Sequence, residues 1–423
     1  MGTDLLDLSE KIWTGESDGA AHQWFGHFGE VASPRSDTAF VAAFSNVNAI
    51  ATDDGLVVVD TSSPLNTEQA HDALRGWDRR PAHTIVYTHG HIDHVFGVER
   101  YEADARDAGA PAPRVVAHEA VPARFDRYIA TAGYNQVINR RQFQLPDFEW
   151  PLDYRYPDQT YRDARAIDVG GVPFELHHAR GETDDHTWVW QPERRTLFCG
   201  DLFCWVSPNC GNPQKVQRYP KDWAVALRTM AALDPEILLP GHGLPIVGAG
   251  RIRQSLGDAA TLLESLHDQT VAMMNEGARL DEIVHGVDYR QDLLEKPYLR
   301  PVYDEPEFVV RNTWRLYGGW YDGNPANLKP APEADLAREI AALAGGADRL
   351  ADRARAAAQR GELRLAGHLA EWAALSAPDD PLVQGARAEV NEARVRAEES
   401  TMSKGVFSWA AAESRRRSTK KKR

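Results

Sequence analysis

The pattern of apolar and polar residues changes near residue 252. Before this point, short apolar runs end at loops that carry Gly, Asp or His, a pattern that predicts β-strands separated by turns. Helical spacing is found at 67–77, and strands are predicted at 41–50, 55–60, 84–87, 115–117, 174–176, 187–190, 196–199 and 236–239. This part of the chain is therefore expected to mix strands and helices.

After residue 252 the apolar residues recur at helical spacing, in segments rich in Ala, Leu, Glu and Arg. Helices are predicted at 256–275, at 307–316 and throughout 333–398. In the last region Gly345-Gly346, Gly361 and Pro378 separate helices of about 12 to 18 residues. These segments resemble stacked helical hairpins of the tetratricopeptide kind, although no fixed repeat emerges. Such a region is more typical of packing or dimerisation than of catalysis.

The composition is that of an ordinary globular protein, with 43% hydrophobic and 26% charged residues. A length of 423 residues favours two domains. No apolar run approaches the roughly 18 residues that a membrane span needs. The acidic start, with Asp4 and Asp7, lacks the basic and then apolar pattern of a signal peptide. We therefore expect a cytoplasmic protein that does not act at a membrane.

Charge and cysteine content narrow the possible functions further. The net charge is −14, and the basic residues within 413–423 leave the rest of the chain more acidic still. An acidic body argues against nucleic acid as a partner, and 413–423 is expected to be a disordered basic tail. Cys199, Cys204 and Cys210 fit no metal or disulfide pattern, so we expect three thiols in a reducing compartment.

One loop carries an unusual density of metal ligands. Residues 88–94 read Thr-His-Gly-His-Ile-Asp-His and follow the strand predicted at 84–87. His89, His91, Asp93 and His94 would therefore leave the carboxyl end of that strand together. Imidazole and carboxylate groups are ligands for zinc-like metals, and a loop with four of them can serve two ions.

Three later residues complete a candidate metal site. Glu182, Asp201 and His242 each lie in a loop that follows a predicted strand. Together with the first loop they provide seven ligands, which is enough for two metals that share one bridging carboxylate. Two metals a few Å apart can share a hydroxide, lower its pKa to near 7 and polarise a substrate oxygen.

In this order the ligands resemble those of the metallo-β-lactamase superfamily. That pattern is a His-x-His-x-Asp-His loop, a third ligand for the first metal, a Gly-Asp pair and a late His. Asp60 also matches the family's structural acid beside the first loop. The resemblance implies that Asp201 bridges two metals, the first held by His89, His91 and Glu182 and the second by Asp93, His94 and His242.

Further residues are similar to the alkyl sulfatase branch of this superfamily. Most members have His at the position of Glu182, whereas alkyl sulfatases have Glu, followed nineteen positions later by an acid, here Asp201. The segments 266–270 (Leu-His-Asp-Gln-Thr) and 319–328 (Gly-Trp-Tyr-Asp-Gly-Asn-Pro-Ala-Asn-Leu) match the branch's dimerisation region. The likeness covers most of 40–400. It implies an α/β fold with an αββα sandwich over 1–252, an all-α dimerisation domain over 253–412, and a homodimer.

The chain also departs from the alkyl sulfatase pattern. The bridging acid is Asp201 where that branch usually has Glu. The segment 303–308, Tyr-Asp-Glu-Pro-Glu-Phe, replaces a Ser-His-Asn segment of the sulfate pocket, and its acids would repel a sulfate group. The sterol-carrier-like domain at the carboxyl end of the family is expected to be absent.

Some residues are candidates for binding the substrate. Asn139, Arg140 and Arg141 resemble an Asn/Arg-Arg segment that lines the alkyl sulfatase pocket, and arginine suits sulfate or carboxylate oxygens. Surface arginines exposed to solvent are the alternative. Trp205 lies just beyond Asp201, where pocket walls form. His178 and His186 flank Glu182 and are either structural histidines, groups behind the metal ligands or substrate ligands, and His118 is expected to lie behind the metal ligands.

The resemblance implies a dinuclear zinc hydrolase, in which Asp93, His94 and Asp201 serve catalysis and a metal-bound hydroxide attacks an alkyl sulfate ester. Fe or Mn are alternatives to Zn²⁺, because the ligand set is rich in oxygen. One alternative function is cleavage of a lactone, thioester, phosphoester or specialised-metabolite bond at the same metals, which the acidic segment at 304–307 favours. Another is a non-catalytic scaffold stabilised by metal, against which the complete ligand set argues.

Overall fold

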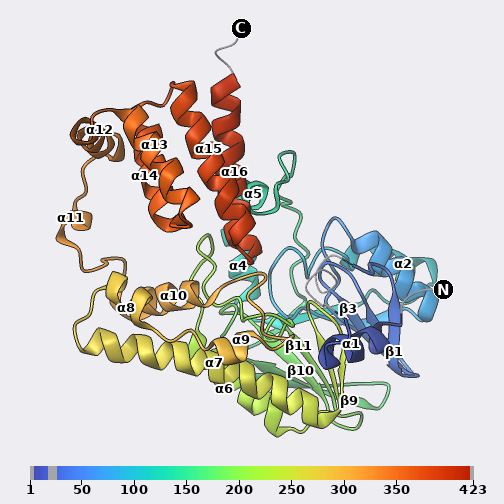
Figure 1. Cartoon of the computed structure of the whole chain (residues 1–423). Coiled ribbons are helices and arrows are strands. Elements are labelled where there is room, and N and C mark those ends of the chain that lie inside the picture. The colour runs from blue at the N-terminus through green and yellow to red at the C-terminus, as the bar shows by residue number, and fades with distance from the viewer. Residues whose placement is uncertain (1–3, 18–25, 420–423) are drawn as a thin grey trace. The chain divides into compact units, whose positions relative to one another are not determined.

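The computed structural model describes residues 4–17 and 26–419, which divide between two units (Figure 1). The first unit comprises the residues up to Ala132 together with Trp150–Gly319. The second comprises Gly133–Glu149 and the residues from Trp320 onward. The helices between 249 and 319 thus cluster with the sheets, although the sequence places a domain boundary at 252. The assignment of 1–252 to the sandwich domain and of 253–412 to the dimerisation domain stays a prediction.

A seven-stranded sheet in the first unit follows the order of the chain. Its first four strands are antiparallel neighbours, and β4 to β7 run parallel. Parallel strands covered on both faces are expected to be continuously apolar, as β4 and the end of β5 are. The strands are β1 (Val31–Arg35), β2 (Thr38–Val41), β3 (Val47–Thr52), β4 (Gly55–Val59), β5 (Ala82–Val86), β6 (Arg114–His118) and β7 (Gln159–Tyr161).

A six-stranded sheet forms the second layer, in the order β13-β12-β11-β10-β9-β8. Neighbouring strands are antiparallel, except that β11 and β12 are parallel. The strands are β8 (Ala164–Val169), β9 (Val172–His178), β10 (Thr187–Gln191), β11 (Thr196–Gly200), β12 (Ile237–Pro240) and β13 (Ile246–Val247). Phe40 and Ile50 of the first sheet share one buried core with Phe174, Leu176 and Leu197 of the second.

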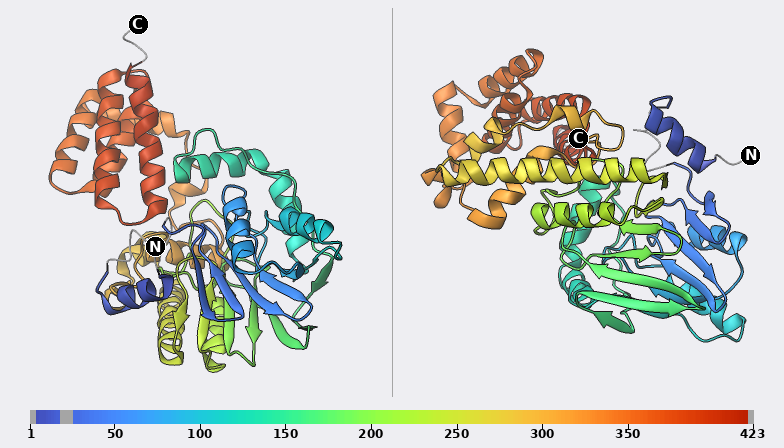
Figure 2. Two further views of the ribbon diagram at one scale, coloured as in Figure 1. Left: turned by 90° about the vertical axis from the view of Figure 1, so that its right-hand side faces the viewer. Right: turned by 90° about the horizontal axis from the view of Figure 1, so that it is seen from below.

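Helices cover the outer faces of the two sheets. On the first sheet α2 (Thr67–Trp77) contacts β1 and β2, and α3 (Val98–Asp107) contacts β5. On the second sheet α6 (Pro220–Ala232) and α7 (Ala249–Asn275) lie side by side (Figure 2). This arrangement is the expected αββα sandwich. The other helices of the unit are α1 (Leu5–Thr14), α4 (Val121–Ala130), α8 (Leu280–Gly286), α9 (Gln291–Leu294) and α10 (Pro306–Gly318).

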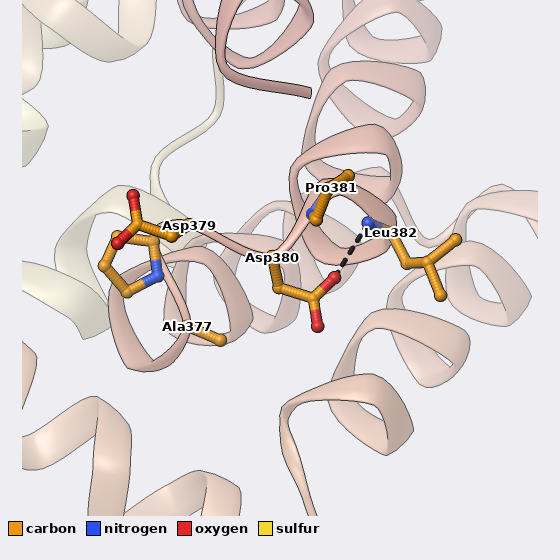
Figure 3. A pocket seen from close by; sticks show the side chains of 6 residues that line it. Ala377, Asp379, Asp380, Pro381 and Leu382 are labelled. Carbon is orange, nitrogen blue, oxygen red and sulfur yellow. Dashed lines mark hydrogen bonds between the residues drawn. The ribbon is translucent and has the colours of Figure 1, made fainter. Parts of the chain in front are cut away.

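The second unit is built from helices joined by short turns. Its two cores are dominated by alanine, and Ala354, Ala357, Ala366 and Ala370 are fully buried, so neighbouring helices pack through small side chains. Asp380 caps α15 by accepting a hydrogen bond from Leu382 N at 2.8 Å (Figure 3). The helices are α5 (Ala132–Phe143), α11 (Pro325–Leu328), α12 (Glu333–Ala344), α13 (Ala347–Gln359), α14 (Leu363–Ser376), α15 (Pro381–Ala397) and α16 (Thr401–Thr419).

The prediction of a disordered tail at 413–423 is wrong for residues 413–419, which form the last turns of α16. Two interactions with α15 explain the difference: Arg415 pairs with Glu392 at 2.9 Å, and Glu413 pairs with Arg387 at 3.3 Å. Ser414 between them is fully buried. Residues 420–423 lie outside the described part of the chain. Among the described residues, no helix combines the length and the apolar character that crossing a membrane requires.

The amphipathic α6 gives a direct test of the sandwich core. Leu227 is fully buried against the second sheet, whereas Val225 on the same helix is 59% exposed. We expect Leu227→Ala to lower the free energy of unfolding by about 2 to 5 kcal/mol through lost burial and a residual cavity. Val225→Ala should change it by no more than about 0.5 kcal/mol. Urea unfolding followed by tryptophan fluorescence measures both, and equal effects would contradict the assigned core.

Candidate metal centre

The carboxyl ends of parallel strands bring the predicted ligands together. In the first sheet β4 leads into Asp60 and the neighbouring β5 leads into the loop of His89 to His94. In the second sheet the parallel pair β11 and β12 leads into Asp201 and His242. Glu182 lies in the turn between β9 and β10. Five segments thus converge on one site: the loops that follow β4, β5, β11 and β12, and the turn between β9 and β10.

All seven predicted ligands lie in two adjacent groups, in each of which the candidate ligand atoms are within 4.8 Å of one another. Asp201 lies between the groups. Its Oδ2 is 3.7 Å from His89 Nε2 and 3.3 Å from His242 Nε2, and its Oδ1 is 3.5 Å from His94 Nε2. The first group is His89, His91, Glu182 and Asp201, and the second is Asp93, His94 and His242.

Distances within each group are similar. Glu182 Oε2 lies 3.8 Å from His89 Nε2 and 3.6 Å from His91 Nδ1. In the second group Asp93 Oδ2 lies 3.7 Å from His94 Nε2 and 3.3 Å from His242 Nε2. Each group therefore surrounds a space bounded by nitrogen and oxygen donors.

Asp60 fixes the histidine loop from behind, as its match to the family's structural acid implied. One carboxylate oxygen accepts a hydrogen bond from Thr88 N and the other from Thr88 Oγ1, both at 2.7 Å. The second oxygen also lies 2.7 Å from His94 Nδ1. A hydrogen bond at Nδ1 leaves Nε2 of His94 facing Asp93 and Asp201, the arrangement that orients a histidine toward a metal.

The strand predicted at 41–50 is interrupted, because β2 ends at Val41 and β3 begins at Val47. The loop between them supports the ligands. Asn46 donates from Nδ2 to Pro240 O and Gly243 O, both at 3.1 Å, and so holds the loop of His242. Ser45 Oγ lies 2.9 Å from His94 Nδ1, and Phe44 O accepts a hydrogen bond from His242 Nδ1. These contacts explain why the mostly apolar segment 41–50 does not continue as one strand.

Glu182 is buried beside the guanidinium group of Arg218. Arg218 donates from Nη1 to Glu182 Oε1 and to Asn209 O, and both side chains of the pair are almost fully buried. Burial raises the pKa of Glu182 to about 7, while Arg218 opposes the shift. Arg218 therefore favours the ionised carboxylate that a metal would require.

A second arginine fixes the other side of the histidine loop. Arg124 of α4 donates from Nε to Asp185 Oδ2 at 2.6 Å and also pairs with Asp184. Asp185 Oδ2 in turn accepts a hydrogen bond from Gly90 N at 3.0 Å. The backbone between His89 and His91 is thereby tied to the turn that carries Glu182.

The other histidines support the ligands from within the core. His186 is fully buried, its ring stacks on that of His89 with centroids 4.9 Å apart, and its Nε2 accepts a hydrogen bond from Asp201 N at 3.1 Å. His178 donates from Nδ1 toward His186 O at 2.9 Å and stacks on His118 at 3.7 Å. The expectation that His186 contacts substrate is therefore replaced by a role in positioning His89 and Asp201.

Two other expected substrate contacts also change. Trp205 is fully buried, donates from Nε1 to Leu244 O at 2.7 Å and packs edge-on against Trp13, so it is a core residue and not an open pocket wall. Asn139, Arg140 and Arg141 lie on α5 in the second unit. There Asn139 donates to Asn135 O and Arg140 to Phe148 O, both at 2.8 Å. Their contact with substrate stays a prediction.

The acidic segment at 303–308 does not present a row of free carboxylates. Asp304 is fully buried, and its Oδ2 accepts a hydrogen bond from Gly211 N at 2.8 Å. Burial raises the pKa of Asp304 to about 7, so this carboxyl group is partly protonated at neutral pH. Glu307 pairs with Arg311 at 3.0 Å on α10. The predicted repulsion of an anionic substrate by this segment therefore loses its basis.

The ligand set fits divalent metals. Four imidazoles and three carboxylates are available, a mixture suited to zinc and to neighbouring transition metals. Glu182 Oε2 and Asp201 Oδ1 are buried and accept no hydrogen bond from the described residues, so a cation would complete their coordination. Burial also lowers the pKa of His89 and His91 well below the usual value, which favours the neutral form that binds metal.

Sequence reasoning missed the residues that hold the ligands in place, chiefly Arg124, Asp185, Asn209 and Arg218. Asp185 stands in the Glu-Thr-Asp-Asp-His run around Glu182, where its position next to a ligand was a usable signal. Arg218 and Asn209 belong to the irregular loop between β11 and α6. No spacing in the sequence marks them, because their contacts with Glu182 depend on how that loop folds back.

The pair of Arg218 and Glu182 yields a prediction about metal binding. Arg218→Met keeps the length of the side chain but leaves a buried carboxylate without its counter-charge, so we expect zinc affinity to fall roughly 10- to 100-fold. Competition with a chromophoric chelator measures the affinity, and circular dichroism checks the fold. Arg180→Met is the matched control, because Arg180 pairs with Asp222 at the surface and is 53% exposed. Equal affinities in the two variants would contradict the role of Arg218.

Two protein families match successive parts of the chain. Residues 41–242 match the metallo-beta-lactamase superfamily, and residues 279–417 match the family described as alkyl sulfatase dimerisation. The first range contains every predicted metal ligand. The second begins within the first structural unit and continues through the helices of the second unit.

Individual relatives agree with these families. A linear primary-alkylsulfatase from Pseudomonas sp. (strain ATCC 19151) is 27% identical over 361 residues, which are 79% of this chain and 67% of that protein. An (R)-specific secondary-alkylsulfatase from Pseudomonas sp. is also 27% identical, over 81% of this chain and 55% of that protein. The chain thus spans between about half and two thirds of the length of these relatives.

A solved structure shows the same fold. The stereoselective inverting sec-alkylsulfatase Pisa1 from Pseudomonas sp. superposes with a TM-score of 0.81 at 23% identity, covering 91% of this chain and 65% of that one. The fold, the order of the ligands and the two family matches agree with one another. The chain thus carries a region that matches the metallo-β-lactamase superfamily, followed by a region that matches the alkyl sulfatase dimerisation family.

Proposed function

We propose that the protein is a metal-dependent hydrolase of sulfate esters that holds one metal ion in each of its two ligand groups. The observation that carries the proposal is the convergence of seven donor residues around Asp201, which lies within 3.7 Å of histidines from both groups. Zinc is the metal we propose. Two such ions would lower the pKa of water and polarise an ester oxygen.

The residues of the chain have separate tasks in this proposal. His89, His91 and Glu182 would hold one ion, and Asp93, His94 and His242 the other, with Asp201 shared. Asp60 keeps Nδ1 of His94 hydrogen-bonded, and Arg218 holds Glu182 and favours its ionised form, so both ligands are oriented before substrate arrives. This preorganisation limits the rearrangement needed during the reaction.

A sulfate ester is the substrate class that the relatives favour, since two of them are described as alkylsulfatases that act on primary or secondary alkyl sulfates. The sequence offered one argument against it, the acids at 304–307. Burial of Asp304 and the pairing of Glu307 with Arg311 weaken that argument. A lactone, thioester or phosphoester has no comparable observation in its favour.

Two further parts of the proposal concern assembly and location. The match of residues 279–417 to a dimerisation family supports a homodimer. Cys199, Cys204 and Cys210 are free thiols, two of them buried, which is common in a reducing cytoplasm.

Purified protein loaded with zinc should release inorganic sulfate from a medium-chain alkyl sulfate. We expect His91→Ala and Asp93→Ala to abolish this release and to lose bound metal, because each removes a donor from one group, while the fold and oligomeric state persist. Ion chromatography detects sulfate, and size-exclusion chromatography with light scattering reports the assembly. His285→Ala and Asp281→Ala are matched controls on α8, where both side chains are at least 60% exposed.

The same assay should include an aryl sulfate, a phosphodiester and a lactone. Sulfate release from the alkyl ester, lost in the two ligand variants and kept in the two controls, supports the proposal. Inert sulfate esters together with cleavage of another ester would overturn the substrate class, although the metal centre would stand. Retained activity in both His91→Ala and Asp93→Ala would refute the role of the metals.

A further inference from the structure

A buried asparagine on α10, Asn312, is joined to the end of the loop between β11 and α6. Its Nδ2 donates a hydrogen bond to Arg218 O at 2.9 Å, and its Oδ1 accepts one from Arg218 N at 3.2 Å. A side-chain amide carries a donor and an acceptor, so Asn312 satisfies both backbone polar groups of Arg218 at once. Because Asn312 is buried, water competes little for these two bonds.

Neighbouring side chains reinforce this contact between α10 and the loop. Gln217 donates from Nε2 to Asn312 Oδ1 at 2.9 Å and to Asn312 O at 3.1 Å. Arg315 lies three residues later on α10, hence on the same side of the helix, and donates from Nε to Gln217 Oε1 at 2.9 Å. Two consecutive residues of the loop, Gln217 and Arg218, are therefore held by one side of α10.

The side chain of Arg218 extends from this contact to the first ligand group. Its Nη1 donates to Glu182 Oε1 and to Asn209 O, and the side chains of Arg218 and Glu182 are almost fully buried. Asn209 Nδ2 also donates to Glu182 Oε1, at 3.4 Å. A guanidinium group meets several acceptors only when its position and plane are fixed. The position of the Arg218 backbone therefore helps to determine where the Glu182 carboxylate stands.

The same loop also contacts residues just before and within α10. Gly211 N donates to Asp304 Oδ2 at 2.8 Å. A side chain at Gly211 would collide with the backbone of Phe308, so the two backbones are in direct contact there. The loop begins at Asp201, the acid between the two ligand groups, and ends at Arg218. Contacts with α10 and the residue before its start thus support the loop at its middle and at its end.

We propose that Asn312 is a positioning residue of the metal centre, which holds Arg218 in the orientation that prepares Glu182 to bind metal. The inference rests on the proposed function and adds to it a part of the chain that maintains the first ligand group. Asn312 belongs to the region 279–417, which matches the alkyl sulfatase dimerisation family. A region that matches a dimerisation family thus also serves the metal centre of its own chain.

The zinc affinity of the full chain, measured by competition with a chromophoric chelator, tests this role without turnover. Asn312→Ala removes both hydrogen bonds to the Arg218 backbone, so we expect the affinity to fall roughly 10-fold. If Asn312 acts through Arg218, the same substitution in an Arg218→Met background should lower the affinity further by less than about two-fold. Two substitutions that damage the site independently would instead multiply their effects.

Asn391→Ala is the matched control, because Asn391 on α15 is also buried and donates from Nδ2 to a backbone carbonyl, Arg387 O, at 3.0 Å. It should leave zinc affinity unchanged, whatever it does to the stability of the second unit. Gln217→Met is a milder variant that removes the hydrogen bonds from Gln217 to Asn312. It should lower the affinity roughly two- to five-fold. It takes the place of Asn312→Ala in the same comparison if circular dichroism shows that Asn312→Ala does not fold.

The outcomes separate this inference from the proposed function. A loss of zinc affinity in Asn312→Ala that disappears in the Arg218→Met background supports the positioning role. Unchanged affinity in both Asn312→Ala and Gln217→Met, or a loss that multiplies with that of Arg218→Met, would overturn the positioning role and leave the two-metal proposal intact. A folded wild-type protein that binds no zinc would overturn both.

Discussion

Three carboxylates that share one buried site impose the main physical constraint on this protein. Asp93, Glu182 and Asp201 come from different loops, and the fold brings them together with four imidazoles. Like charges at such a site repel, and the charge of Asp201 is one of the influences that raise the pKa of Glu182. Cations must therefore balance them. Arg218 is one such cation within the protein, and bound metal ions would balance the remaining carboxylate oxygens.

This constraint explains how the surrounding structure is organised. Asp60 and Ser45 contact His94 in the loop that leaves the first sheet, and Asn46 holds the loop of His242 that leaves the second sheet. Arg124 and Asp185 join the histidine loop to the turn of Glu182. Almost every ligand is thus held by a neighbour that is itself buried and hydrogen-bonded. Precise orientation of ligands through such outer contacts is what a catalytic metal centre requires.

Much of this could be predicted from the sequence, because strand periodicity and ligand order are local signals. The helix at 67–77, the central strands and all seven ligand positions follow from apolar runs and the residues after them. The edge strands β7 and β13, of three and two residues, are too short to give a period. The gap between β2 and β3 was missed because Ser45 and Asn46 are flanked by apolar residues, and its hydrogen bonds to His94 and His242 arise only in the folded chain.

Residues that act through long-range contacts were the hardest to predict. Trp205 and His186 stand beside ligands in the sequence, yet both are directed into the core. The sequence predicted that the Asp304 carboxylate would face the substrate. It is instead buried and accepts a hydrogen bond from Gly211 N. Burial and charge pairing decide these roles, and neither can be read from spacing alone.

The central claim, that the seven ligands form a two-metal centre, is tested most directly by counting metal ions. Inductively coupled plasma mass spectrometry on zinc-loaded, extensively dialysed protein gives the number of ions per chain. The account predicts about two, as expected when two donor groups share a carboxylate. A protein that keeps well under one ion per chain, while remaining folded by circular dichroism, would contradict it.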